Sequence, residues 1–299
     1  MKRKSTKRKI QSAMEYLMTY GWAILIIAVV LVILFSLGIT NPLFFAPKAP
    51  PRSCSVFRPD GPGSSYDINL LGVCNGEIPE YVASFSTSDG SMININTNKL
   101  LSGSTAFTIS FWVNPTTLGT SQLGFLDEEC LIGVKFDQPS TIEVDLGPPC
   151  WAAITYSTFS YIKANQWIFI ATTWKSGSSV IDYVDGKGQQ ASGPISTVLS
   201  PVLGTTVKNF EIGPAISDEP ATAMTGEISN VQVYNSSLGP NTIAAMYAKG
   251  IGGAPIDLQN LVGWWPLNGN ANDYSGNNND GTASNVIWSG TWWQSYTAP

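Results

Sequence analysis

Apolar and polar residues alternate along much of the chain after about residue 80, which is the period of a β-strand with one buried face. The alternation is clear at 93–95, 107–113, 132–136 and 142–146. Residues 167–174 are apolar on both faces, as expected for a central strand of a sandwich. These short segments are separated by Gly, Pro and Asn, and they predict a mainly β protein built as a β-sandwich.

Two local patterns add detail to this prediction. Val180–Val184 leads into Asp185-Gly186, a residue pair typical of hairpin turns. Residues 242–249 have a helical pattern that ends at Gly250. We therefore expect one hairpin and one short helix among the strands.

The first forty residues follow a different pattern. Residues 16–47 contain no charged side chain, and Trp22–Leu37 alone would span ~24 Å as a helix. We expect a basic leader at 1–10 and a membrane-spanning helix at 11–39. The positive-inside rule then places the leader in the cytoplasm and the rest of the chain outside the cell membrane. The apolar run is too long for a secretory signal peptide, whereas an uncut signal anchor stays an alternative.

The next segment, 40–79, is rich in Pro, Gly and Ser, and we expect it to form a neck below a domain at 80–299. The predicted extracellular location favours oxidised cysteines. The four cysteines allow three pairings, and the simplest are Cys54–Cys74 and Cys130–Cys150, which have equal spacing. A four-cysteine zinc site is the alternative, but no C-x2-C pair is present.

Composition and charge exclude several functions. The formal net charge is −5, and without the basic leader ten basic residues face twenty-one acidic ones. Such a domain repels phosphate backbones, so we expect no binding to nucleic acid. The chain has no His, which excludes Ser-His-Asp and Cys-His catalysis and His-ligated zinc. Carboxylate chemistry and oxygen ligation of calcium stay open.

The sequence around the predicted leader has a specific resemblance. Lys9–Leu17, with Gln-Ser-x-x-Glu directly before the apolar run, resembles the archaeal class III (type IV pilin-like) leader. The resemblance implies that a prepilin peptidase cuts between Ile10 and Gln11. It also implies that Glu15 pairs with the new N-terminal amine during self-assembly through the helix, in a surface filament. Without that role, Glu15 would be a carboxylate that favours the helix dipole.

Three segments of the expected sandwich resemble the LamG-like (concanavalin A-like) jelly roll. They are 107–113 (FTISFWV), 166–187 with its YVDGK hairpin, and 226–234 (GEISNVQVY). Residues 263–269 and 273–282 resemble the opening strand and loop of that family, yet they stand last in this chain. We expect them to fill the first-strand position, as in a circular permutation. The alternative is a second, truncated jelly roll.

The resemblance also bears on calcium. Family members often hold calcium in the region of the Asp273–Asp280 loop, and calcium prefers six to eight oxygen ligands. The candidate ligands are Asp273, Asn278 and Asp89. Equally, Asn, Asp, Gly and Ser build turns without any ion.

The resemblance includes glycosidases as well. Laminarinase-type jelly rolls use a Glu-x-Asp-x-x-Glu strand, but the nearest string, Glu143–Pro148, has Pro at the acid position. Glu128 and Glu129 are adjacent, so on a strand they would point to opposite faces. We therefore expect no catalytic residue and no enzyme.

Two function classes follow. The first is a membrane-anchored or pilus-like surface protein in assembly or adhesion, with a protein or glycan ligand. The second is a calcium-dependent carbohydrate-binding module on the same anchor, for which Trp112, Trp151 and Tyr156 are candidate sugar platforms. Asn235, in Asn-Ser-Ser, is a candidate glycosylation site.

Overall fold

The chain divides into two compact units, Met1–Lys48 and Ala49–Pro299. The computed structural model describes residues 20, 22–32, 54–57, 66–68, 78–95, 97, 100–118, 123–128, 131–147, 153–199, 209–213 and 225–299. In the first unit, residues 20 and 22–32 are helical and exposed. Among the residues described, no helix combines the length and the apolar character required to cross a membrane.

The second unit begins with a small sheet, in the order β2-β1-β3. Its strands are β1 (Cys54–Phe57), β2 (Tyr66–Ile68) and β3 (Ile78–Pro79). β1 pairs antiparallel with β2 and parallel with β3. The segment expected to be a neck therefore contains paired strands.

The rest of the unit is a sandwich of two large sheets, as the alternation predicts. The first sheet has the order β10-β9-β8-β7-β14-β5-β17. The second has the order β13-β12-β11-β6-β15-β4-β18, and β16 also pairs with β15.

The strands of the first sheet are β5 (Met92–Ile95), β7 (Leu123–Glu128), β8 (Ile132–Gln138), β9 (Thr141–Leu146), β10 (Ala153–Thr158), β14 (Phe210–Ile212) and β17 (Gly281–Ser284). Those of the second are β4 (Val82–Phe85), β6 (Ala106–Pro115), β11 (Ile168–Lys175), β12 (Ile181–Val184), β13 (Lys187–Gln190), β15 (Gly226–Tyr234), β16 (Leu261–Trp265) and β18 (Ile287–Ser289).

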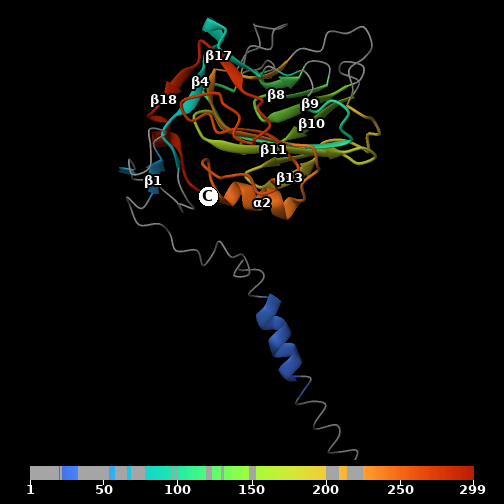
Figure 1. Cartoon of the computed structure of the whole chain (residues 1–299). Coiled ribbons are helices and arrows are strands. Elements are labelled where there is room, and N and C mark those ends of the chain that lie inside the picture. Colours follow the sequence, from blue (N-terminus) through green and yellow to red (C-terminus); the bar gives the residue numbers. More distant parts are fainter. Residues whose placement is uncertain are drawn as a thin grey trace, which may run out of the picture. The chain divides into compact units, whose positions relative to one another are not determined.

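Two apolar cores result from this arrangement. The first lies between the sheets and includes the buried side chains of Phe107, Phe111 and Trp265. The second lies on the outer face of the sheet that contains β11, against helix α2 (Pro240–Ala248). Figure 1 shows this helix beside the sheet. There the ring of Trp112 stacks on that of Tyr247, with 5.8 Å between centroids. Because Trp112 is buried in this core, it is not a sugar platform.

The local predictions for the hairpin and the helix are confirmed. β12 and β13 form a hairpin in which Val184 pairs with Lys187. Asp185 and Gly186 between them have φ of 50° and 75°, the left-handed conformation of a type I′ turn. Helix α2 begins two residues before the predicted start and ends one residue before the predicted end.

The C-terminal segment completes the sandwich. β16 pairs with β15, β17 with β5, and β18 with β4, so these late strands lie in both sheets. The indole N–H of Trp292 donates to the carbonyl of Glu80 at 3.4 Å, which brings the end of the chain to the start of the sandwich. The alternative of a second, truncated jelly roll is therefore wrong.

Candidate functional site

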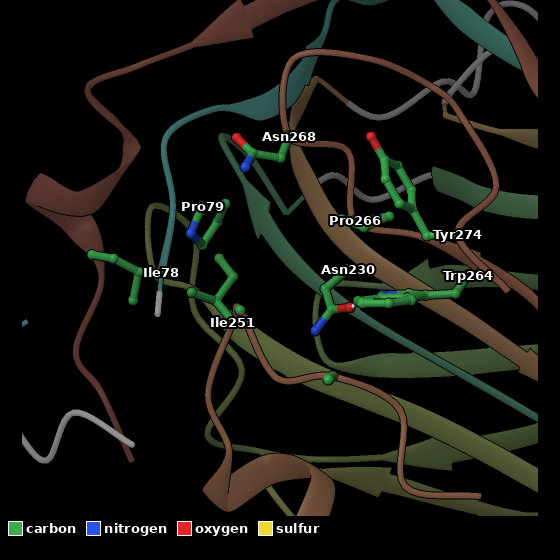
Figure 2. A pocket seen from close by; sticks show the side chains of 10 residues that line it. Ile78, Pro79, Asn230, Ile251, Trp264, Pro266, Asn268 and Tyr274 are labelled. Carbon is green, nitrogen blue, oxygen red and sulfur yellow. Dashed lines mark hydrogen bonds between the residues drawn. The ribbon is translucent and has the colours of Figure 1, made fainter. Parts of the chain in front are cut away.

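A pocket with a volume of about 420 Å³ lies beside β16, on the outer face of the second sheet. Figure 2 shows the lining side chains, which converge from β3 of the small sheet, the bulge of β15, the segment after α2, and β16 with the loop that follows it. The lining residues are Ile78, Pro79, Asn230, Ile251, Gly252, Ala254, Trp264, Pro266, Asn268 and Tyr274. None of them is charged.

Trp264 is the largest side chain of the pocket, and strand geometry places it there. Successive side chains of a strand point to opposite faces, so the adjacent Trp264 and Trp265 separate. Trp265 is fully buried between the sheets and stacks on Phe210, with centroids 5.8 Å apart. Trp264 is left partly exposed on the other face, packed against the second core.

Hydrogen bonds fix the plane of the Trp264 ring. Its indole N–H donates to Oδ1 of Asn230 at 2.8 Å. Asn230 sits in a bulge of β15 with φ of 52°, a left-handed conformation that Asn tolerates better than most residues. Gln232 donates to the same oxygen at 3.0 Å, and the hydroxyl of Tyr234 donates to Gln232 at 2.6 Å. A buried polar chain therefore holds Trp264 in one orientation.

The loop after β16 adds Tyr274 to the pocket. The amide of Tyr274 donates to the carbonyl of Trp264 at 2.8 Å, and the two ring centroids are 6.1 Å apart at 65°. Asp273 holds this loop. Its Oδ1 accepts from the amides of Trp264 and Ser275 at 3.0 and 2.8 Å. Its Oδ2 accepts from the Ser275 hydroxyl and the Asn279 amide at 2.8 and 2.9 Å.

The three residues expected to bind calcium are therefore placed as follows. Asp273 accepts four hydrogen bonds from its own chain, and Asn278 is exposed in the same loop with φ of 59°. Asp89 is exposed at the end of the 3-10 helix Thr87–Asp89 and accepts from the Ser88 hydroxyl at 2.8 Å. No group of three or more His, Cys, Asp or Glu suited to a metal occurs within the described parts of the chain. The calcium site stays a prediction.

The carboxylates of the laminarinase-like string lie on one face of β9, and both are buried. Glu143 and Asp145 each pair with the ammonium of Lys135, at 3.0 and 2.9 Å. Burial, together with the charge of Asp145, raises the pKa of Glu143 to about 7, although Lys135 opposes the shift. Pro148 of the same string lies outside the described residues.

The other predicted residues are divided between described and undescribed segments. Asn235 is exposed directly after β15, where a glycan could be attached, and Tyr156 is half-exposed on β10. The predicted residues outside the described side chains are Ile10, Gln11, Glu15, Cys54, Cys74, Cys130, Cys150 and Trp151.

Sequence reasoning missed Trp264, Tyr274 and Asn268. The sequence nevertheless held a usable pattern, the Trp-Trp pair in a predicted strand. Neighbouring side chains of a strand point to opposite faces, so one of the two indoles must point away from the central core. The partners that shape a pocket around that indole are not visible in the local pattern.

The family of the chain follows from comparison with known proteins. The profile of the Concanavalin A-like lectin/glucanases superfamily matches residues 87–244, just over half of the chain. The chain belongs to this superfamily. None of the curated proteins compared with the chain matches it.

Comparison with solved structures gives similar chains of low sequence identity. A protein from Bacteroides ovatus ATCC 8483, described as a "putative carbohydrate binding protein", has 14% identity and a TM-score of 0.54, over 76% of this chain and 64% of that one. The chain thus spans less than two thirds of that structure. A heptameric SAP-like pentraxin from Limulus polyphemus has 12% identity and a TM-score of 0.49, over 70% and 92% of the two chains. At such identities the likeness concerns the fold alone.

Proposed function

We propose that this protein is a non-catalytic, membrane-anchored surface protein that binds neutral glycans in the Trp264 pocket. The pocket itself carries the proposal. Its volume of about 420 Å³ lies in the range of small-ligand sites, and it combines a fixed indole and a phenol with the amide side chain of Asn268. Aromatic rings pack against the apolar C–H faces of sugar rings, and amides bond sugar hydroxyls.

The absence of charge in the pocket lining favours neutral sugars over acidic or basic ones. A charged ligand group would lose hydration there without meeting an opposite charge in the lining. The proposed glycan binding thus rests on the match between the rigid, apolar ring of Trp264 and an uncharged sugar ring.

Glycan binding without hydrolysis is the form that we propose. In a glycosidase, one carboxyl group donates a proton and the other attacks or activates water at the glycosidic bond. Glu143 and Asp145 are instead buried and paired with Lys135. That pairing supports a structural role for both carboxylates.

The anchor is the second part of the proposal and rests on the sequence. We propose that a prepilin peptidase-like enzyme cuts between Ile10 and Gln11, and that the helix keeps the protein in the membrane or in a filament. N-terminal sequencing of protein from native membranes tests this. A first residue of Gln11 is expected, whereas an intact leader would mean a plain signal anchor.

A glycan array with the full chain tests the binding function. We expect neutral glycans to bind, and Trp264→Ala to weaken binding by about tenfold or more. Trp293→Ala is the matched control, because Trp293 is also a partly exposed Trp on the second core but does not line the pocket. An equal loss in both variants, or no binding by the parent protein, would remove the proposal.

The same array with and without EDTA tests the calcium-dependent alternative. Since Asp273 is already satisfied by four donors of its own chain, we expect binding to persist in EDTA. Binding that EDTA abolishes and calcium restores would instead support the predicted calcium site at Asp273, Asn278 and Asp89.

A further inference from the structure

One side-chain amide group of the pocket is left for a ligand, and it is a donor. The backbone N–H of Tyr81 donates to Oδ1 of Asn268 at 2.9 Å. This bond identifies the oxygen end of the amide, so Nδ2 is the other end. Among the residues that the structure describes, Nδ2 of Asn268 has no hydrogen-bond partner. Figure 2 shows Asn268 at the side of the pocket near Pro79.

The second amide of the pocket is fully used. Oδ1 of Asn230 accepts from Trp264 and Gln232, and its Nδ2 donates to the carbonyl of Gly253 at 2.9 Å. The indole N–H of Trp264 already donates to Asn230 in the same network. Asn230 is therefore a positioning residue, and Trp264 offers a ligand only its apolar ring.

Apart from the rings of Trp264 and Tyr274, the remaining walls are aliphatic. They consist of Ile78, Pro79, Ile251, Ala254 and Pro266. A plain hexose would bury hydroxyl groups against these walls, where each hydroxyl without a hydrogen-bond partner weakens binding. A ligand that fits must present a small apolar group to the walls and one hydrogen-bond acceptor to Asn268. An acetamido group has both, because its methyl is apolar and its carbonyl accepts.

We propose that the pocket is selective for N-acetylated amino sugars. The sugar ring packs on Trp264, the acetamido carbonyl accepts from Nδ2 of Asn268, and the acetamido methyl contacts the aliphatic walls. This inference rests on the proposed glycan binding and specifies its substrate class. No bond is made or broken in the process.

The test compares two disaccharides with the same linkage, N,N′-diacetylchitobiose and cellobiose, by titration calorimetry on the full chain. We expect the diacetylated sugar to bind at least about tenfold more tightly. The critical variant is Asn268→Asp. It keeps the oxygen that Tyr81 holds and replaces the Nδ2 donor by an acceptor, so it should abolish the preference. Trp264→Ala should weaken both sugars, and Trp293→Ala neither.

Each outcome has a separate meaning. Equal affinity for the two sugars, or an unchanged preference in Asn268→Asp, overturns the acetamido selectivity and leaves glycan binding intact. If an acetyl-lysine peptide binds as tightly as the diacetylated sugar, the pocket recognises the acetamide alone, and the sugar specificity is overturned. Failure of all neutral glycans on the array overturns the proposed function itself.

Discussion

Replacement of Asp182 by Asn should stabilise the protein at alkaline pH. Asp182 lies on β12 and is fully buried. Its Oδ1 accepts from the hydroxyl of Thr172 at 2.7 Å, and its Oδ2 accepts from the hydroxyl of Ser157 on β10. The Ser157 bond joins the two sheets, whereas the Thr172 bond lies within one sheet. No cation contributes to the pKa of Asp182. Asn keeps the size and the Oδ1 acceptor, and the Ser157 hydroxyl can rotate to accept from Nδ2.

The magnitude follows from the pKa of Asp182. Burial raises this pKa from 3.8 to about 6, although both hydroxyls oppose the shift. The native state therefore binds more protons than the unfolded chain between about pH 4 and pH 6, and the free energy of unfolding falls as the pH rises through this interval. A shift of about two pKa units corresponds to about 3 kcal/mol lost above pH 6. The neutral Asn avoids this loss, less the cost of an imperfect hydrogen bond.

Urea unfolding of the purified protein between pH 4 and pH 8 measures this effect. We expect the free energy of unfolding of Asp182→Asn to be about 1–3 kcal/mol higher than that of the parent protein at pH 8. Near pH 4 this difference should disappear. Asp89→Asn, at an exposed carboxylate, is the control and should change little at either pH. The reasoning is refuted if Asp182→Asn is no more stable than the parent at pH 8, or if the pH dependence is unchanged.

Two further predictions concern buried positions. Gly263→Ala should destabilise the protein by about 1–3 kcal/mol in thermal or urea unfolding, since a Cβ at Gly263 would overlap the indole of Trp265. An unchanged stability would contradict this prediction, because the indole would then have to move aside without cost. Lys135→Met should lower the free energy of unfolding by about 3–5 kcal/mol at pH 8, because Glu143 and Asp145 would stay buried without their cation. This loss of stability should be smaller at pH 5, where Glu143, with its pKa of about 7, takes up a proton. An equal loss at both pH values would contradict the role of Lys135 as the cation that balances these buried carboxylates.

The strands, the hairpin and the helix could be predicted from the sequence because their causes are local. The period-2 alternation at 107–113 produces β6, whose odd-numbered positions from Phe107 to Val113 lie between the sheets. Asp185-Gly186 adopts left-handed φ values that suit this residue pair, and Gly250, with φ of 75°, follows helix α2. Each of these features depends on residues within a few positions of one another.

The position of the C-terminal segment could be predicted only in part from the sequence. Its resemblance to an opening strand indicated the position that it fills, but the choice between completing one sandwich and starting another depended on strand pairing. The pairing of β17 with β5 joins residues far apart in the chain, such as Gly281 and Ile95. Only the tertiary structure decides such a contact, because a short strand carries no information about which distant edge it meets.

The candidate site depended still more on tertiary structure. The sequence by itself determined that a sandwich would form and that one Trp of the Trp264-Trp265 pair would face away from the central core. The bulge at Asn230, the bond from Tyr81 to Asn268 and the aliphatic walls were decided by the tertiary structure alone. The physical reason is that side-chain direction follows from local strand geometry, whereas a pocket requires segments far apart in sequence to pack together.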